Sequence, residues 1–72
     1  MRSFRYQIYV GNIMNCKATI IKDEDEYIVT EVITHIVSLG KTREAAIDNL
    51  RLAMEQYYEG INRGAIQIDV IG

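Results

Sequence analysis

The chain has 72 residues, a formal net charge of −2 and a composition that is 49% hydrophobic. This length allows one domain, and the interspersed acidic and basic residues argue against a nucleic-acid binder, which would show a basic patch or stripe. With Cys16 as the only cysteine and His35 as the only histidine, an intrachain disulfide and a Cys/His metal site are excluded.

These exclusions bear on oligomeric state and location. Small domains that lack disulfides and metals often gain stability from a partner chain, so we expect a homo-oligomer, a dimer or higher. No apolar run has the length of a membrane-spanning helix, and the first residues do not lead into a signal-peptide hydrophobic region. We therefore expect a cytoplasmic protein without a cofactor or bound metal.

The first third of the chain shows two stretches with the two-residue alternation of β-strands. Residues 4–10 alternate apolar and polar side chains, and Gly11 and Asn12 follow as a two-residue hairpin turn. Residues 14–21 alternate again, with Met14, Cys16, Ala18 and Ile20 on one face. We expect residues 1–13 to be an extension that contains an extra strand, and residues 14–72 to form the domain.

An acidic turn and two further strands come next. The run from Asp23 to Glu26 is polar and self-repelling, which is typical of a solvated turn. Residues 27–33 are rich in β-branched side chains and predict a strand, and residues 36–38 predict a short third one.

The second half of the chain predicts one amphipathic helix and a closing strand. Thr42 is the expected N-cap, Glu44 lies in the first turn, and Gly60 is the expected stop. Arg51 and Glu55 have the spacing of an i,i+4 ion pair. Residues 66–70 alternate as a strand. The apolar face of the helix comprises Ala46, Ile47, Leu50, Ala53, Met54, Tyr57, Tyr58 and Ile61.

Together these elements predict an α+β fold. An antiparallel-rich sheet, in a β-β-β-α-β order with an additional N-terminal strand, has one helix packed on one of its faces. The other face is then either solvated or used for pairing.

Four segments resemble the HicB-type antitoxin family in their order and spacing. They are KDEDEYIV at 22–29, SLGKT at 38–42, EAAIDNL at 44–50 and EQYYEG at 55–60, and the resemblance covers about residues 14–71. It implies a partial ribonuclease H-like fold without the catalytic carboxylates of the nuclease. It also implies oligomerisation and the binding of a small basic ribonuclease toxin, HicA.

Two features of the chain depart from the family pattern. The family has a proline- and glycine-containing turn between its second and third strands, whereas residues 31–35 contain neither. We expect this turn to be built differently or to be replaced by one longer bent strand. The chain also ends directly after its last predicted strand, so operator binding through a C-terminal DNA-binding module is not expected to carry over.

The other candidate sites have simpler structural explanations. Gly40-Lys41-Thr42 ends like a phosphate-binding loop, but His35 occupies the place of the required first glycine. The acidic turn lacks the glycine of an EF-hand, because Ile28 stands at that position. Cys16 and His35 fall in different strands without an orienting third residue, and Cys16 lies on an apolar face, so we expect a packed and inert thiol.

The leading functional hypothesis is a non-enzymatic protein-binding module, a HicB-like antitoxin that covers the RNA-binding surface of a HicA-type toxin. The alternative is an orphan oligomeric structural or small-ligand-binding domain without a toxin; a nuclease is less favoured because the inward strand positions are apolar. The expected docking surface for a basic partner consists of acidic residues. These are Asp23, Glu24, Asp25, Glu26, Glu44, Asp48, Glu55 and Glu59.

Overall fold

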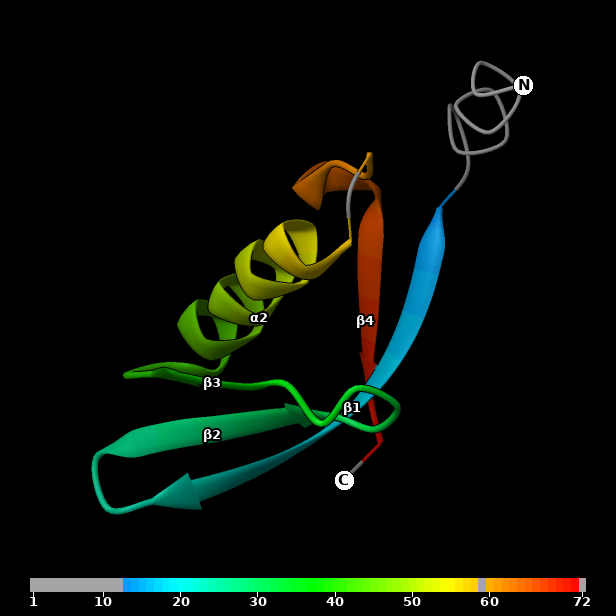
Figure 1. Cartoon of the computed structure of the whole chain (residues 1–72). Helices are drawn as coiled ribbons and strands as arrows, with labels where there is room; N and C mark the ends of the chain where they lie inside the picture. The colour runs from blue at the N-terminus through cyan, green and yellow to red at the C-terminus, as the bar shows by residue number, and fades with distance from the viewer. Residues whose placement is uncertain (1–12, 59, 72) are drawn as a thin grey trace, which may run out of the picture.

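The structure is a computed structural model that describes residues 13–58 and 60–71. The chain order is β1 (Met14–Asp23), β2 (Glu26–Glu31), β3 (Val37–Gly40), α2 (Arg43–Tyr57), a 3-10 helix η1 (Arg63–Ala65) and β4 (Ile66–Val70) (Figure 1). The expected α+β fold with one helix on a sheet is confirmed. The strand expected at residues 4–10 and its Gly11–Asn12 turn lie outside the described residues.

The sheet is mixed, with the strand order β3-β2-β1-β4. β1 and β2 pair antiparallel, as do β2 and β3, whereas β4 returns parallel to β1. This follows from the connections, because short turns join antiparallel neighbours and a parallel neighbour needs a crossover such as α2. β1 pairs with β2 from Ala18 to Asp23 and with β4 from Met14 to Ala18, so only Ala18 has a partner strand on both sides.

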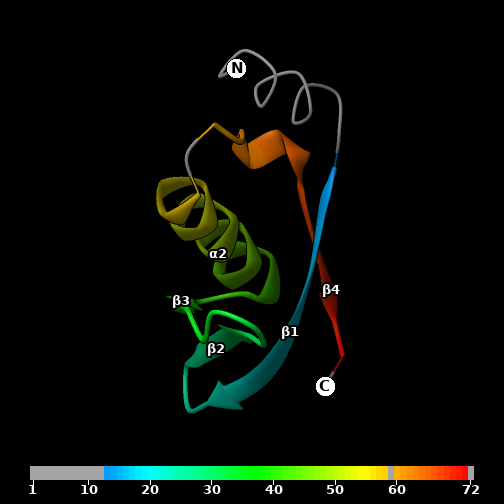
Figure 2. The same ribbon diagram turned by 45° about the vertical axis from the view of Figure 1, so that its right-hand side comes forward.

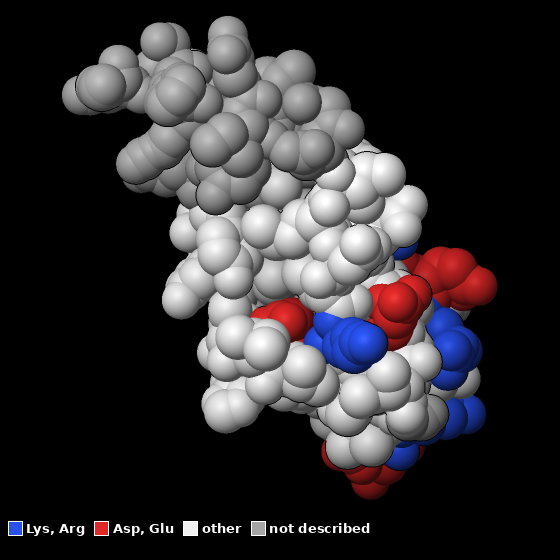
Figure 3. Space-filling view, turned by 90° about the vertical axis from the view of Figure 1, so that its right-hand side faces the viewer, with Lys and Arg blue, Asp and Glu red and all other residues white. Residues whose placement is uncertain are grey.

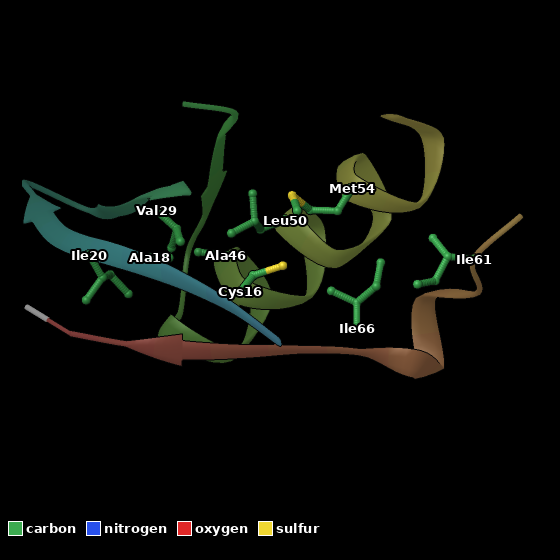
Figure 4. Close-up of a cluster of buried hydrophobic side chains, with 9 residues drawn as sticks. All are labelled: Cys16, Ala18, Ile20, Val29, Ala46, Leu50, Met54, Ile61 and Ile66. Carbon is green, nitrogen blue, oxygen red and sulfur yellow. The ribbon is translucent and has the colours of Figure 1, made fainter. Parts of the chain in front are cut away.

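The core lies between α2 and one face of the sheet (Figures 1 and 2). As expected, Cys16, Ala18 and Ile20 all point to this face, and Leu50 and Met54 of α2 are fully buried against it. Full burial of a large aliphatic side chain contributes about 1.5–3 kcal/mol, so a handful of residues stabilises the fold. The buried apolar residues, drawn in Figure 4, are Cys16, Ala18, Ile20, Val29, Ala46, Leu50, Met54, Ile61 and Ile66.

The start of α2 agrees with the sequence, but its end does not. The Thr42 hydroxyl accepts a hydrogen bond from the Ala45 N–H at 3.0 Å, as expected of an N-cap. The helix does not reach Ile61, because Tyr58 is already extended, with φ −104° and ψ 123°. Ile61 is nevertheless buried, from the loop that follows Gly60 (φ 85°), and the expected core residue Tyr57 is 59% exposed. The helical spacing at position 61 was therefore coincidental.

Gly40 brings the end of β3 into direct contact with α2. A Cβ atom at this position would lie 2.3 Å from the backbone nitrogen of Ala46 and 2.7 Å from its Cα. These are backbone atoms of the first helical turns, so they cannot move aside as a flexible side chain would. Gly40 is therefore required by a close approach of two backbones.

The strand expected over residues 27–33 is too long, because β2 ends at Glu31 and a turn occupies residues 32–34. The buried carboxylate of Glu31 builds this turn. Its Oε1 accepts from the N–H groups of Ile33 (3.2 Å) and Thr34 (2.7 Å) and from the Thr34 hydroxyl (2.7 Å). The turn is thus built by a side chain, without a proline or a glycine, and His35 takes the positive φ (65°) that closes it.

Candidate functional site

The expected acidic surface is divided between two parts of the molecule. Asp23 to Glu26 form the β1–β2 hairpin tip, and Glu44 follows Gly40, which pairs with Tyr27 next to that tip. These five residues therefore lie at one end of the sheet. Asp48 and Glu55 lie further along α2, and Glu59 is outside the described residues.

The two acidic residues further along α2 are engaged within the chain. Asp48 accepts a hydrogen bond from Arg51 at 3.3 Å in an i,i+3 ion pair, and Glu55 accepts from the backbone N–H of Arg63 at 3.2 Å. The expected Arg51–Glu55 pair is therefore wrong, because Arg51 turns to Asp48 and to the carbonyl oxygen of Ile66 (3.0 Å). A partner that used either carboxylate would have to displace these contacts.

Basic side chains accompany the acidic ones. Lys22 adjoins the hairpin tip, with its Nζ 5.8 Å from the centre of the Tyr27 ring, and Lys41 and Arg43 flank the start of α2. From the side of β4, Figure 3 likewise shows acidic and basic side chains next to one another in the lower part of the molecule. The charge of this chain is therefore interspersed, and the hairpin tip is its densest run of one sign.

A second candidate surface is the sheet face that points away from α2. Residues that alternate with the buried ones must lie on this face, and no described element covers it (Figures 1 and 2). Ile21, Ile28 and Leu39 stand directly side by side across three strands, and Val37 is two residues from Leu39. We call these four residues the open-face patch.

The open-face patch is apolar and accessible. Ile21 is 61% exposed, Val37 54% and Leu39 46%, whereas Ile28 is half-buried. The adjoining row, Thr19 to Thr30 to Val37, adds two small hydroxyl side chains. An apolar patch shared by neighbouring strands marks a place where another molecule can dock. The acidic hairpin tip borders it, since Ile21 and Ile28 lead directly into that turn.

The thiol of Cys16 is buried. Burial raises the pKa of Cys16, and the neighbouring negative charge of Glu31 raises it further, so the thiolate is suppressed at neutral pH. His35 is exposed in the 32–36 segment, where its backbone N–H donates to the carbonyl oxygen of Glu31. The structure thus confirms that Cys16 is packed.

Among residues 13–58 and 60–71, His, Cys, Asp and Glu side chains form no group of three or more that could hold a metal ion. Likewise, none of the helices within those residues is both long and apolar enough to cross a bilayer.

Sequence reasoning missed both the open-face patch and the role of Glu31. A signal for the patch exists in the adjacent apolar pairs Ile20-Ile21 and Ile28-Val29, which place apolar side chains on both faces of a strand. No comparable signal marks Glu31, because an acidic residue at the end of a strand is usually exposed.

Comparison with known proteins does not extend this description. No protein-family model, no curated protein and no solved structure matches the chain. The site must therefore be interpreted from its own residues.

Proposed function

We propose that this protein is a non-enzymatic protein-binding module that docks a partner on the open-face patch and the adjoining acidic hairpin tip. The observation that carries this proposal is the row of Ile21, Ile28 and Leu39 on a sheet face that no described element covers. Exposing such a row to water does not stabilise the domain, whereas a bound partner would remove these apolar side chains from water.

The size of the open-face patch limits what it can do alone. Its side chains are already partly buried, so covering them would contribute about 1 kcal/mol each, or about 4 kcal/mol in total. Association costs at least that much in lost translational and rotational freedom. A stable complex would therefore need further contacts, and the hairpin-tip carboxylates would supply them to a basic partner.

In its finer form, the proposal is a HicB-like antitoxin that occludes a small basic ribonuclease toxin. The order of the four sequence segments supports it, and so does the β-β-β-α-β order of the elements. The toxin would be neutralised by steric covering of its RNA-binding surface, assisted by the acidic tip, and this chain would supply no reactive group.

A second candidate is an orphan oligomeric domain without a toxin. The turn at residues 32–34 favours it, because the Glu31 carboxylate takes the place of the family's proline and glycine. Any partner contact that the family makes through this turn would be altered here.

Co-purification with the product of a neighbouring gene that encodes a small basic protein tests the partner. Binding at micromolar concentrations is expected, with an association rate that falls as salt is added. A neighbour that is not small and basic, or one that does not bind, would refute the toxin assignment and leave the orphan domain.

A matched pair of variants tests the surface. Leu39→Lys, on the open-face patch, should weaken partner binding at least tenfold, because it buries an unpaired charge in the interface. Leu52→Lys is the control, because Leu52 is a similarly exposed leucine (38%) on α2, at the opposite side of the sheet. Equal effects of the two variants would contradict docking on the open face.

A further inference from the structure

The outer edge of β4 carries backbone groups without partners among the described residues. Two hydrogen bonds show which backbone N–H and C=O groups of β4 point to β1 and which point to the open edge. The Ile71 N–H donates to the Ala18 carbonyl oxygen on β1 at 2.9 Å, and the Ile66 carbonyl oxygen accepts from Arg51 Nε at 3.0 Å. Because successive residues alternate, the backbone groups of Gln67 and Asp69 also face β1, and those of Ile66, Ile68 and Val70 face the open edge.

Only part of this edge is available. Ile66 is engaged twice, since its N–H donates to the Arg63 carbonyl oxygen and its own carbonyl oxygen accepts from Arg51. Ile68 and Val70 therefore present the free set, which consists of two N–H donors and two carbonyl acceptors. Such a set is a template for one more strand.

The other edge of the sheet is less suitable. The Ile36 carbonyl oxygen of the segment before β3 accepts from Glu31 N–H, so the groups of Val37 and Leu39 face outward. The Leu39 carbonyl oxygen, however, already accepts from the side-chain amide of Asn49 at 2.7 Å. Pairing of β3 with β3 of a second copy would require this carbonyl oxygen. Asn49 of α2 therefore obstructs the β3 edge, whereas no described residue bonds to the outward-facing groups at the centre of the β4 edge.

We propose that β4 pairs antiparallel with β4 of a second copy of this chain, with Asp69 opposite its own counterpart at the two-fold axis. In this register each Ile68 exchanges both backbone hydrogen bonds with Val70 of the other copy. The four free groups of one strand are thereby matched to the four of the other. Moving the axis to Ile68 would instead pair Val70 with Ile66, whose groups are already engaged.

The side chains along the edge fit the same arrangement. Ile68 and Val70 point to the helix-covered face but are only half-buried. Across the two-fold axis each Ile68 becomes the direct neighbour of a Val70, and both lose exposed apolar surface. The two four-stranded sheets join into one continuous sheet, with both helices on the same side.

The charged side chains at the two-fold axis limit the affinity of the proposed dimer. Two Asp69 carboxylates face each other, which weakens the pairing. Lys17 lies directly beside Asp69 in the register of β1 with β4, so each carboxylate has a cationic neighbour. A reversible rather than a permanent dimer is the result. This inference does not depend on the proposed toxin partner, and the failure of either one leaves the other standing.

Disulfide trapping tests the register. Opposed residues at a non-hydrogen-bonded antiparallel position have Cα atoms about 4.5 Å apart, within the range that a disulfide bridges. Asp69→Cys should therefore form a covalent dimer on mild oxidation of the purified full chain. Gln67→Cys is the control, on the same strand and the same face. In this register the Gln67 positions of the two copies are offset by four residues, about 13 Å along the strands, so this variant should remain monomeric on a denaturing gel.

Two outcomes of this trapping would overturn the proposal. One is a lack of cross-linking by Asp69→Cys, and the other is equally rapid cross-linking by Gln67→Cys. The wild-type chain, whose Cys16 is buried, shows how much dimer forms without an edge cysteine.

A proline variant provides a second measurement. Val70→Pro removes an N–H that faces the open edge and leaves the ladder with β1 intact, so circular dichroism should remain that of the wild type. It deletes two of the four hydrogen bonds of the dimer, and the dissociation constant from analytical ultracentrifugation should rise about 5-fold to 150-fold. An unchanged dissociation constant, or a wild-type chain that stays monomeric at high concentration, would overturn the proposal.

Discussion

At the scale of single residues, this small protein depends on one buried carboxylate. Glu31 is 2% exposed, yet its Oε1 atom accepts three hydrogen bonds from the turn that follows it. Charge-assisted hydrogen bonds of this kind compensate for the loss of water around the carboxylate. The turn between β2 and β3 therefore rests on Glu31 and Thr34, without a proline or a glycine.

Burial, together with the charge of this carboxylate, should make the contribution of Cys16 to stability depend on pH. Burial and the charge of Glu31 raise the pKa of Cys16 above its ordinary value of 9.0, so folding favours the neutral thiol. The full stability is present below pH 9.0. As the pH rises above that value, the unfolded thiol ionises first, and the free energy of unfolding falls.

We therefore expect wild-type protein to lose more stability than Cys16→Ala between about pH 8 and about pH 10, as measured by urea unfolding. The alanine variant controls for every pH-dependent contribution other than that of Cys16. Parallel losses in the two proteins would contradict a raised pKa of this thiol.

At the scale of elements, the contact between β3 and α2 depends on the absence of a side chain. The backbone of Gly40 approaches that of Ala46 so closely that a Cβ atom would lie 2.3 Å from the Ala46 nitrogen. Asn49 holds the same junction from the side, through its hydrogen bond to the Leu39 carbonyl oxygen. The start of α2 is thus positioned on β3 before the rest of the helix crosses the sheet.

Gly40→Ala should accordingly destabilise the fold by about 3 kcal/mol or more, because either β3 or the first turn of α2 must move. The matched control is Gly64→Ala, where an added Cβ would meet nothing within 4 Å. Its effect should remain within about 0.5 kcal/mol. Thermal unfolding of both variants measures the difference, and equal melting temperatures would contradict the close contact at Gly40.

At the scale of the whole molecule, one helix must serve two halves of a staggered sheet. β2 pairs with the C-terminal half of β1 and β4 with its N-terminal half, and the two pairings meet only at Ala18. Leu50 and Met54 of α2 lie in the core cluster with residues of β1, β2 and β4 and have no exposed surface (Figure 4). Among residues 13–58 and 60–71, so small a core leaves one sheet face and the β4 edge uncovered.

Leu50 and Leu52 provide the test of this core. Leu50→Asp should unfold the chain, because a buried unpaired carboxylate costs as much as the entire stability of a small domain, about 5 kcal/mol. Leu52→Asp, two residues away at an exposed position, should retain the native circular dichroism and melt within a few degrees of wild type. A folded Leu50→Asp protein would refute the proposed packing of α2.

Much of the architecture could be predicted because local patterns decide it. The alternation of Cys16, Ala18 and Ile20 predicts a strand with one buried face, and Thr42 with Glu44 predicts the start of the helix. The candidate site was harder to predict from the sequence, because the sheet face opposite α2 can be identified only once the position of α2 is known. The division of the acidic residues between the hairpin tip and α2 likewise depends on the path of the chain.

The sequence by itself determined the kinds and the order of the described strands and of α2, and the buried face of β1, because these depend on side-chain periodicity and capping within a few residues. Only the tertiary structure decided where α2 ends, how Glu31 builds a turn, and that β4 lies parallel to β1 with Ile68 and Val70 on an open edge. The physical reason is that these features depend on contacts between distant residues, such as Arg51 with Ile66 and Ile71 with Ala18. No local pattern records them.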